Sequence, residues 1–439
     1  MIENKKKAKL LALVSIVFFS VSGGPYGLEE IVSSVGPLNT LLLILLLPIV
    51  WTIPETMIVA ELSSSYPIQG GYYRWVQISM GRFWGFMEGW WSILYTLIDL
   101  SLYPILFSTY LKILFPSIAP QLLYFVQLTM IWVCAVVNIL GIRVVGNILT
   151  SFQFFILFIF AIFIILGMNH ISFDFSSIMS SYQQPTSSKL FLGLSIAFWN
   201  FIGWDNGSTV LHEVDNPGLN YHKALFISIP IIVFFYFFPT LVGLCIHTNW
   251  QDWRFGEFSF ISDSMGFPFL GTVLAVGGML TSLGLFNSML LSSTRVIMTL
   301  AEDKLLPSMF SAVHSKYETP HIAIIFTALV YSVLVLFSFE TLIGYDVFLY
   351  LIAILLEAIA LVILRKRNPD IYSHYKIPFG MAGVYCVVSI VCLVVLFMVV
   401  INLSCFHGDI KTSFFTAFLM LSGVPIYLWY EKLKTLSNK

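Results

Sequence analysis

Acidic side chains recur inside the apolar stretches of this 439-residue chain. They are Glu29, Glu30, Glu55, Glu61, Glu88, Asp99, Asp205 and Glu357. A charged group among apolar residues is costly unless it is paired, protonated or bound to a ligand, so each acid is a candidate functional residue. Few basic side chains share these stretches, and Arg295 is the nearest exception. The excess of negative groups suits chemistry in which a protein binds a cationic solute or carries a proton.

The first two acids follow an interruption in an apolar stretch, SGGPYGLEE, from Ser22 to Glu30. Its glycines allow backbone conformations closed to other residues, and its proline removes an N–H donor. The pattern predicts a helix that breaks and restarts, which places Glu29 and Glu30 in the first turn of the new helix. Free N–H groups and the helix dipole favour an anion there. Two interpretations stay open: one glutamate is a built-in anion at a solute site, or both serve ordinary helix capping.

A second interruption lies in SIAFWNFIGWDNGSTVLHEVDNPG. The residues that break this apolar run are Asn200, Gly203, Asp205, Asn206 and Gly207. Asp205 is preceded by Trp199 and Trp204, whose rings could offer an ammonium group cation–π contact of roughly 0.5–2 kcal/mol. The alternative is that Asp205 caps a half-helix that begins near Asn206.

The other acids differ in their positions. Asp99, in LIDLSLYP, lies in the middle of its stretch, with Tyr95 one helical turn earlier on the same face. A solute-binding role and a structural hydrogen bond are both open for Asp99. Glu357, in YLIAILLEAIALVI, is similarly isolated, and either a proton-carrying or a structural role fits it. The remaining acids are better explained by gating or structural contacts. They are Glu55, Glu61 and Glu88.

Membrane-spanning helices are the elements expected to position these acids. Hydrophobic residues make up 58% of the chain and charged residues 10%, against roughly 25% charged residues in soluble domains. A helix crosses the hydrocarbon layer with about 20 apolar residues, and long continuous runs of this kind exclude a closed barrel. The sequence therefore predicts an all-α integral membrane protein with twelve spans. They are 8–34, 38–64, 83–114, 120–140, 147–168, 189–212, 223–247, 269–302, 320–338, 344–365, 381–402 and 412–431.

The placement of lysine and arginine predicts the orientation, because positively charged loops stay cytoplasmic. With the N-terminus inside, 18 of the 22 basic residues lie inside, against Lys112, Lys189, Arg254 and Lys411 outside. We therefore expect a multi-pass protein of the cell membrane with both termini cytoplasmic. The basic start imitates a signal peptide, but we expect it to be retained because the cleavage region would be SGGPYG.

Several classes of function are disfavoured by the sequence. A net charge of −1 predicts no nucleic-acid partner. The polar residues His212, Glu213, Asp215 and His222 lack the spacing of metal ligands. No nucleotide-binding loop of the G-x-x-x-x-G-K-[ST] type occurs, and no pair of aspartates stands out in the surroundings that an intramembrane protease needs. We expect no enzyme, no cofactor and no metal, and a monomer or weak oligomer whose partners are the bilayer and a small solute.

The two interruptions occupy corresponding positions, five predicted spans apart. Discontinuous helices at matching places are typical of secondary transporters built from inverted repeats, which hold their solute between the broken helices. This pattern divides the chain into a first repeat at 1–168, a second repeat at 169–367, and a C-terminal pair of helices with a tail at 368–439.

The sequence blocks also resemble a known family. VSGGPYGLEE, PETMIVAELSSSYPIQGGYYRWV, LIDLSLYPILF, FWNFIGWDNGSTVLHEVDNPG and RNPDIYSHYKIP are similar to those of the amino acid, polyamine and organocation transporter superfamily. The likeness is greatest to its polyamine-uptake branch and runs from about Ser22 to Val400. It implies a five-plus-five inverted-repeat fold with two added helices, discontinuous helices one and six, and cation-driven uptake by alternating access.

The resemblance implies a substrate site along the two interrupted helices and the helices that face them. We expect this site to contain Ser22, Gly23, Gly24, Tyr26, Gly27, Glu29, Tyr95, Asp99, Trp199, Ile202, Trp204, Asp205 and Met289. Trp199 takes the place of a gating aromatic residue. The candidate proton-coupling residues are Glu30, Asp99, Asp205 and Glu357, and protons are favoured over sodium as the coupling ion.

Two departures from the family pattern bear on the substrate. The fifth span, NILTSFQFFILFIFAIFIILG, lacks the lysine that some proton-coupled members use. Met289 stands where polyamine-uptake relatives carry an acid, so the predicted site has one negative group fewer. The substrate expected is a polyamine or cationic amino acid, with a neutral amino acid transporter or an amino acid and amine exchanger as the alternative.

Overall fold

The computed structural model describes residues 7–170, 185–336, 339–405 and 418–437. Within these ranges the regular structure is helical, and an isolated bridge joins Ala8 to Val214. Eight described helical stretches, with Pro37–Ser65 counted as one, are long and apolar enough to cross a membrane, which confirms the predicted all-α membrane protein in this coarser sense. The number of twelve crossings stays a prediction, and residues 412–417 of the last expected span lie outside the described residues.

Most of the predicted spans coincide with helices. In chain order the helices are α1 (Leu10–Val21), α2 (Glu29–Val35), α3 (Pro37–Leu47), α4 (Ile53–Ser65), α5 (Gly71–Met80), α6 (Arg82–Leu114), α7 (Pro120–Ile139), α8 (Ile142–Met168), α10 (Ser187–Trp199), α11 (Pro217–Ile246), α12 (Glu257–Ser264), α13 (Pro268–Glu302), α14 (His321–Leu334), α15 (Phe339–Arg367), α16 (Gly380–Cys405) and α18 (Gly423–Ser437). The short π-helical and 3₁₀ segments are η2 (Pro48–Thr52), η3 (Asn206–Glu213), η4 (Trp250–Asp252) and η5 (Ser308–Ser311).

Proline and glycine mark many of the helix ends. A proline in the first turn begins α3, α7, α11 and α13, where its missing N–H leaves no helical hydrogen bond unmade. Gly81 and Gly141, both at positive φ, separate α5 from α6 and α7 from α8. The predicted starts at residues 147 and 223 were late, because α8 already begins at Ile142 and α11 at Pro217.

Three local features were not predicted. The short helices α5 and α12 fall in segments expected to be loops, because both are too short to register as apolar spans. The sequence predicts one span at 38–64, and within it the π-helical turn η2 joins α3 to α4. Pro48 and Pro54 lie at the first turns of η2 and α4, where the missing N–H groups permit this change of winding.

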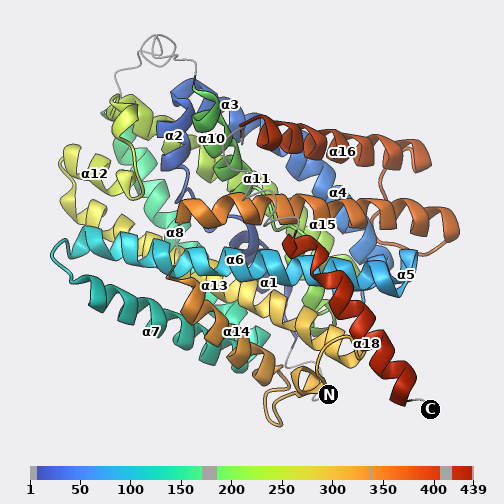
Figure 1. Cartoon of the computed structure of the whole chain (residues 1–439). Coiled ribbons are helices and arrows are strands. Elements are labelled where there is room, and N and C mark those ends of the chain that lie inside the picture. The colour runs from blue at the N-terminus through green and yellow to red at the C-terminus, as the bar shows by residue number, and fades with distance from the viewer. Residues whose placement is uncertain (1–6, 171–184, 337–338, 406–417, 438–439) are drawn as a thin grey trace.

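The helices form a bundle around α13, which packs against α1, α6 and α8. On another side, α15 packs between α6 and α16 (Figure 1). The short helices α5 and α12 lie at opposite ends of the bundle (Figure 1). This arrangement brings α1, α6, α13 and α15 together around the segments that join α1 to α2 and α10 to η3.

These two joining segments are not helical in the structure. The first runs from the end of α1 at Val21 to the start of α2 at Glu29, and its three glycines all have positive φ. The second runs from the end of α10 at Trp199 to the start of η3 at Asn206, with Gly203 at φ 99°. Both therefore expose backbone groups that need partners other than a helical neighbour.

Hydroxyl groups from neighbouring helices supply those partners. Thr281 of α13 donates to the carbonyl oxygen of Gly23 at 2.6 Å. From α11, Tyr236 donates to the carbonyl of Asn200 at 2.9 Å and Tyr221 to that of Trp204 at 2.8 Å. Non-helical backbone is tolerated away from water when its N–H and C=O groups form hydrogen bonds inside the protein. These hydrogen bonds explain how both segments can lie within an apolar bundle.

The second segment packs closely against the end of α1 at Gly203. A Cβ atom there would lie 2.2 Å from the carbonyl oxygen of Ser20 in α1. We expect Gly203→Ala to force the segment away from α1 and to lower the unfolding temperature strongly. Gly266→Ala is the matched control. Gly266 also has positive φ, but a Cβ atom added to it would meet nothing within 4 Å, so this variant bears only backbone strain of about 1–2 kcal/mol. Equal thermal unfolding of the two purified variants would contradict this close approach.

Candidate functional site

A small buried cavity lies between the ends of the two non-helical segments. Its volume is about 20 Å³, measured as the space open to the centre of a water molecule. The residues that line it are Ser20, Val21, Ser22, Tyr95, Asp99, Tyr103, Trp199, Asn200, Ile202, Gly203, Asn206, Leu285, Met289, Asp346 and Tyr350. A single water occupies about 10–15 Å³ on this measure, so a larger solute requires the surrounding helices to move apart.

The cavity brings together part of the predicted site. The predicted residues that line it are Ser22, Tyr95, Asp99, Trp199, Ile202 and Met289. The predicted residues that do not line it are Gly23, Gly24, Tyr26, Gly27, Glu29, Trp204 and Asp205. The first group comes from separate parts of the sequence, which meet because α6 contacts Trp199 and Asn206 at the ends of the second segment and α13 contacts Gly23 in the first.

Asp99 is the acid that the cavity holds in place. It is 4% exposed, and its carboxylate accepts hydrogen bonds from Trp199 Nε1 at 2.8 Å and from the Tyr103 hydroxyl at 2.6 Å. The rings of Tyr103 and Trp199 are stacked, with centroids 6.1 Å apart. Tyr95, one turn before Asp99, donates instead to Asn206 at 3.2 Å. Asp99 thus has two neutral donors and no cationic partner among the described contacts.

Asp346 is a cavity residue that the sequence analysis missed. It lies within the predicted span 344–365, is fully buried, and interacts electrostatically with Asp99. The sequence carried a signal for it, since Asp346 and Glu357 are eleven residues, or about three helical turns, apart on one face of a single apolar helix. The sequence analysis did not pair Asp346 with Asp99, because the two aspartates lie on different helices, α15 and α6.

A second group of acids lies beside the cavity and centres on Tyr350. The Tyr350 hydroxyl lies 2.6 Å from Asp205 Oδ1, contacts Glu55 Oε1 closely, and accepts the N–H of Gly203 at 3.0 Å. A hydroxyl has one proton to donate and two lone pairs to accept with. Because Gly203 occupies one lone pair, Tyr350 can donate to only one carboxyl group and must accept from the other. The arrangement is satisfied when one of the two carboxyl groups carries a proton.

These contacts separate two interpretations left open for Asp205. Asp205 precedes η3, but its side chain makes no capping hydrogen bond. Its carboxylate is instead directed at Tyr350 of α15. Glu55, for which a structural or gating role was favoured, belongs to the same group and is 0% exposed.

Glu357 and Glu88 extend this group. Both are buried, with both carboxyl oxygens lacking hydrogen-bond partners among the described residues, and each interacts electrostatically with Asp205. Glu88 was expected to make a helix-end contact, but it lies more than one turn inside α6 and faces the interior. We call Glu55, Glu88, Asp205, Glu357 and Tyr350 the Tyr350 cluster.

Glu29 and Glu30 lie away from both groups. The Glu29 carboxylate accepts the N–H of Gly27 at 2.7 Å and that of Gly256, before α12, at 3.2 Å. Glu30 is partly exposed and accepts the N–H of Phe255 at 3.4 Å. Two of these three contacts tie the start of α2 to the segment before α12, and neither glutamate lines the cavity.

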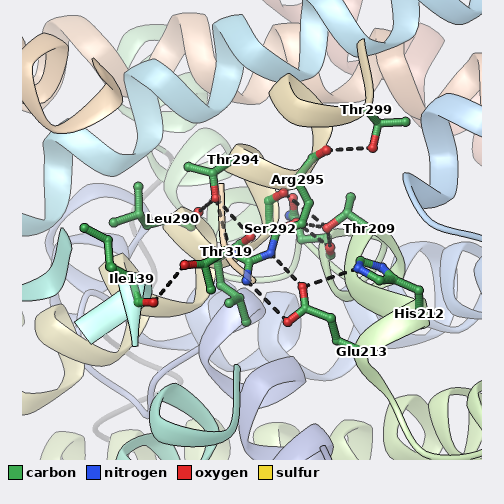
Figure 2. A network of polar contacts seen from close by, with 12 residues as sticks. Ile139, Thr209, His212, Glu213, Leu290, Ser292, Thr294, Arg295, Thr299 and Thr319 are labelled. Atoms are coloured by element: carbon green, nitrogen blue, oxygen red, sulfur yellow. Dashed lines mark hydrogen bonds and ion pairs between the residues drawn. The ribbon is translucent and has the colours of Figure 1, made fainter. Parts of the chain in front are cut away.

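The basic residues of the apolar core are paired elsewhere. Arg295 of α13 is fully buried, and its Nε donates to Glu213 Oε1 of η3 at 2.9 Å (Figure 2). Glu61, expected to make a helix-end contact, pairs with Arg365 of α15. Among the described residues no group of three His, Cys, Asp or Glu side chains is placed to hold a metal ion.

Removal of one partner from the Arg295–Glu213 pair should be strongly destabilising. Glu213→Gln leaves the buried guanidinium without its carboxylate, and removing one partner of a buried pair costs about 3 kcal/mol or more. We expect a lower unfolding temperature in detergent for Glu213→Gln. The double variant Arg295→Met with Glu213→Leu should recover most of the loss, because it removes both charges. A double variant as unstable as the single one would show that the charge pairing is not the cause.

The comparisons with known proteins agree with one another. Residues 11–424 match the sequence profile of the family described as amino acid permease. The chain is 34% identical to Polyamine transporter PUT1 of Oryza sativa subsp. japonica over 91% of its own length and 75% of the relative's. It is 33% identical to Polyamine transporter RMV1 of Arabidopsis thaliana over 86% and 77%, respectively.

A more distant match is the Large neutral amino acids transporter small subunit 2 of Homo sapiens, at 25% identity over 99% of this chain and 83% of the relative. The profile covers nearly the whole chain, and the polyamine transporters exceed 30% identity over most of it. The chain therefore belongs to the amino acid permease family, within the amino acid, polyamine and organocation transporter superfamily.

Proposed function

We propose that this protein is a secondary active carrier that imports a polyamine or a cationic amino acid, driven by protons and working by alternating access. The observation that carries the proposal is a small buried cavity whose described lining residues include two acids and no lysine or arginine. A site of this charge favours a cationic solute, because carboxylates away from water need a positive partner or a proton.

The architecture proposed for this carrier has twelve transmembrane helices. In it α1 with α2, and α10 with η3, are the two halves of discontinuous helices one and six. Residues 1–168 and 169–367 form the inverted repeats, and residues 368–439 add two helices and a cytoplasmic tail. The proposed protein lies in the cell membrane with both termini cytoplasmic, as a monomer or weak oligomer. The non-helical segments at matching positions and the excess of inner basic residues support this arrangement.

The choice of a cationic substrate over a neutral one has two supports. The cavity is lined by Asp99 and Asp346, and a neutral amino acid, whose ammonium group is offset by its own carboxylate, would leave the net negative charge of these acids uncompensated. The relatives above 30% identity carry the name polyamine transporter, and the one named for large neutral amino acids is 25% identical. A neutral amino acid carrier or an exchanger of the same fold is the alternative that the transport experiment below separates.

Proton coupling is proposed to act through the Tyr350 cluster. Counting donors and acceptors around Tyr350 requires a proton on Glu55 or Asp205, and Glu88 and Glu357 add buried carboxyl groups without partners among the described residues. Gly203 links this cluster to the cavity, because its N–H contacts Tyr350 and it also lines the cavity. A change of protonation at the cluster would therefore move the backbone beside the bound solute.

Transport into proteoliposomes tests the proposal. Purified protein is reconstituted, and uptake of labelled putrescine, spermidine, arginine and leucine is measured with and without an imposed pH gradient, acidic outside. We expect saturable putrescine uptake that the gradient accelerates and that spermidine competes. Saturable leucine uptake without competition from diamines would replace this substrate assignment with the neutral one. Putrescine uptake that follows a sodium gradient and ignores the pH gradient would contradict proton coupling.

A further inference from the structure

Asp346 is a buried acid that no described side chain or backbone group satisfies. It lies on α15, is 0% exposed, and both of its carboxyl oxygens lack a hydrogen-bond partner among the described residues. Buried polar groups nearly always have a partner, and a buried carboxylate without one is costly. The position therefore calls for a proton or a cation that is not part of the protein.

The cavity beside Asp346 supplies room for such a group. Asp346 and Asp99 both line it and interact electrostatically. The two acids are not equivalent, because Asp99 already accepts hydrogen bonds from Trp199 and Tyr103, whereas neither oxygen of Asp346 is used by a described residue. One carboxylate is thus fixed in place, and the other offers free acceptors to whatever enters.

The other residues that line the cavity favour an alkyl ammonium group as the ligand. A primary ammonium has three donors and no acceptor, which matches two facing carboxylates. The stacked rings of Tyr103 and Trp199 offer a face for cation–π contact. Leu285 and Met289 provide apolar contact for a methylene chain. An α-amino acid would instead bring its own carboxylate next to the ammonium, where like charges repel.

We propose that Asp346, together with Asp99, forms the binding site for a primary ammonium group and selects linear amines over α-amino acids. This inference rests on the proposed carrier function and names its substrate class, which is aliphatic diamines and polyamines. Asp346 acts here as a specificity-determining residue supplied by α15. At Met289, α13 supplies no acid to the cavity. Asp346 of α15, which lines the same cavity, supplies one.

Equilibrium binding to purified full-length protein tests this site. Isothermal titration with putrescine, arginine and leucine compares the wild type with Asp346→Asn, which keeps the shape and removes the charge. We expect the Kd for putrescine to rise about 10- to 100-fold, as for loss of a hydrogen-bonded charge, and the preference for putrescine over arginine to shrink. Glu257→Gln is the control: this buried acid pairs with His247 outside the cavity, and its putrescine Kd should match the wild type.

Thermal unfolding without ligand is the second readout. Asp346→Asn removes an unpaired buried charge, so its unfolding temperature should equal or exceed that of the wild type. A large drop in that temperature would show a structural role and overturn the proposal. An unchanged putrescine Kd in the folded variant would also overturn the proposal. A third contradicting result would be a putrescine affinity that requires sodium in the wild type but no longer requires it in Asp346→Asn.

The outcomes also distinguish failure of the ammonium-site proposal from failure of the proposed carrier function. Wild-type protein that binds putrescine with Asp346-dependent affinity but moves no solute in proteoliposomes would contradict the carrier and leave the ammonium site intact. Wild-type putrescine uptake that Asp346→Asn reproduces with the same KM would contradict the ammonium site and leave the carrier intact.

Discussion

Replacing Asp205 by asparagine is expected to abolish putrescine accumulation driven by a pH gradient, while exchange of internal for external putrescine continues. Asparagine resembles a permanently protonated aspartate in shape and charge, so the solute-loaded states remain accessible. The variant then has no proton to release inside, and the empty carrier cannot return to its outward-facing state in a deprotonated form. Net accumulation is lost, whereas exchange needs no such return.

The effect should be large because Asp205 is central to the Tyr350 cluster. Its carboxylate contacts Tyr350, and the acids Glu55, Glu88 and Glu357 all interact with it electrostatically. Proteoliposome uptake and counterflow on the same preparation measure the two activities. Asp215→Asn is the control, since Asp215 is exposed on the segment that follows η3. Gradient-driven accumulation that survives in Asp205→Asn would remove Asp205 from the coupling mechanism.

Replacing Asp99 by asparagine is expected to weaken putrescine binding by about 30-fold or more, because truncating one partner of a buried, hydrogen-bonded charge pair typically costs about 2–5 kcal/mol. Asp99 is the carboxylate that Trp199 and Tyr103 hold in the cavity, so its loss removes an anchored anion beside the solute. The pH dependence of the remaining transport should be unchanged, because the Tyr350 cluster is intact.

Trp199→Phe provides the graded comparison for Asp99→Asn. It keeps an aromatic ring but removes the indole N–H that donates to Asp99. We expect a smaller loss of affinity for Trp199→Phe, since the carboxylate and its Tyr103 donor remain. A Trp199→Phe protein that binds putrescine more weakly than Asp99→Asn would assign the affinity to the indole and not to the carboxylate.

The two non-helical segments show what the sequence could predict. SGGPYG and FIGWDNG stand out within apolar runs because glycine, proline and polar residues cannot be explained by burial in lipid. Their hydrogen-bond partners were not predictable, because Tyr221, Tyr236 and Thr281 look like ordinary helix residues in their own segments. Which hydroxyl reaches which carbonyl depends on how the helices pack, and periodicity alone carries no such information.

For the acidic residues, too, the sequence predicted some features and helix packing determined others. Asp99 and Asp205 were singled out because a charge in an apolar run is costly wherever the run packs. Assigning them to different groups required knowing that Trp199 reaches Asp99 while Tyr350 reaches Asp205. Glu55 and Glu88 were undervalued, Glu88 because it lies near the start of its predicted span and Glu55 although it lies well inside the predicted span 38–64. Their full burial follows from the interior faces that their helices present in the bundle.

A structure of the protein with putrescine bound tests the central claim most directly, because the claim concerns where a cation binds. Single-particle cryo-electron microscopy of the protein with saturating putrescine should show elongated density between Asp99 and Asp346, beside Trp199, with the two non-helical segments moved apart. Density for putrescine at any other place, with this cavity unchanged, would contradict the account.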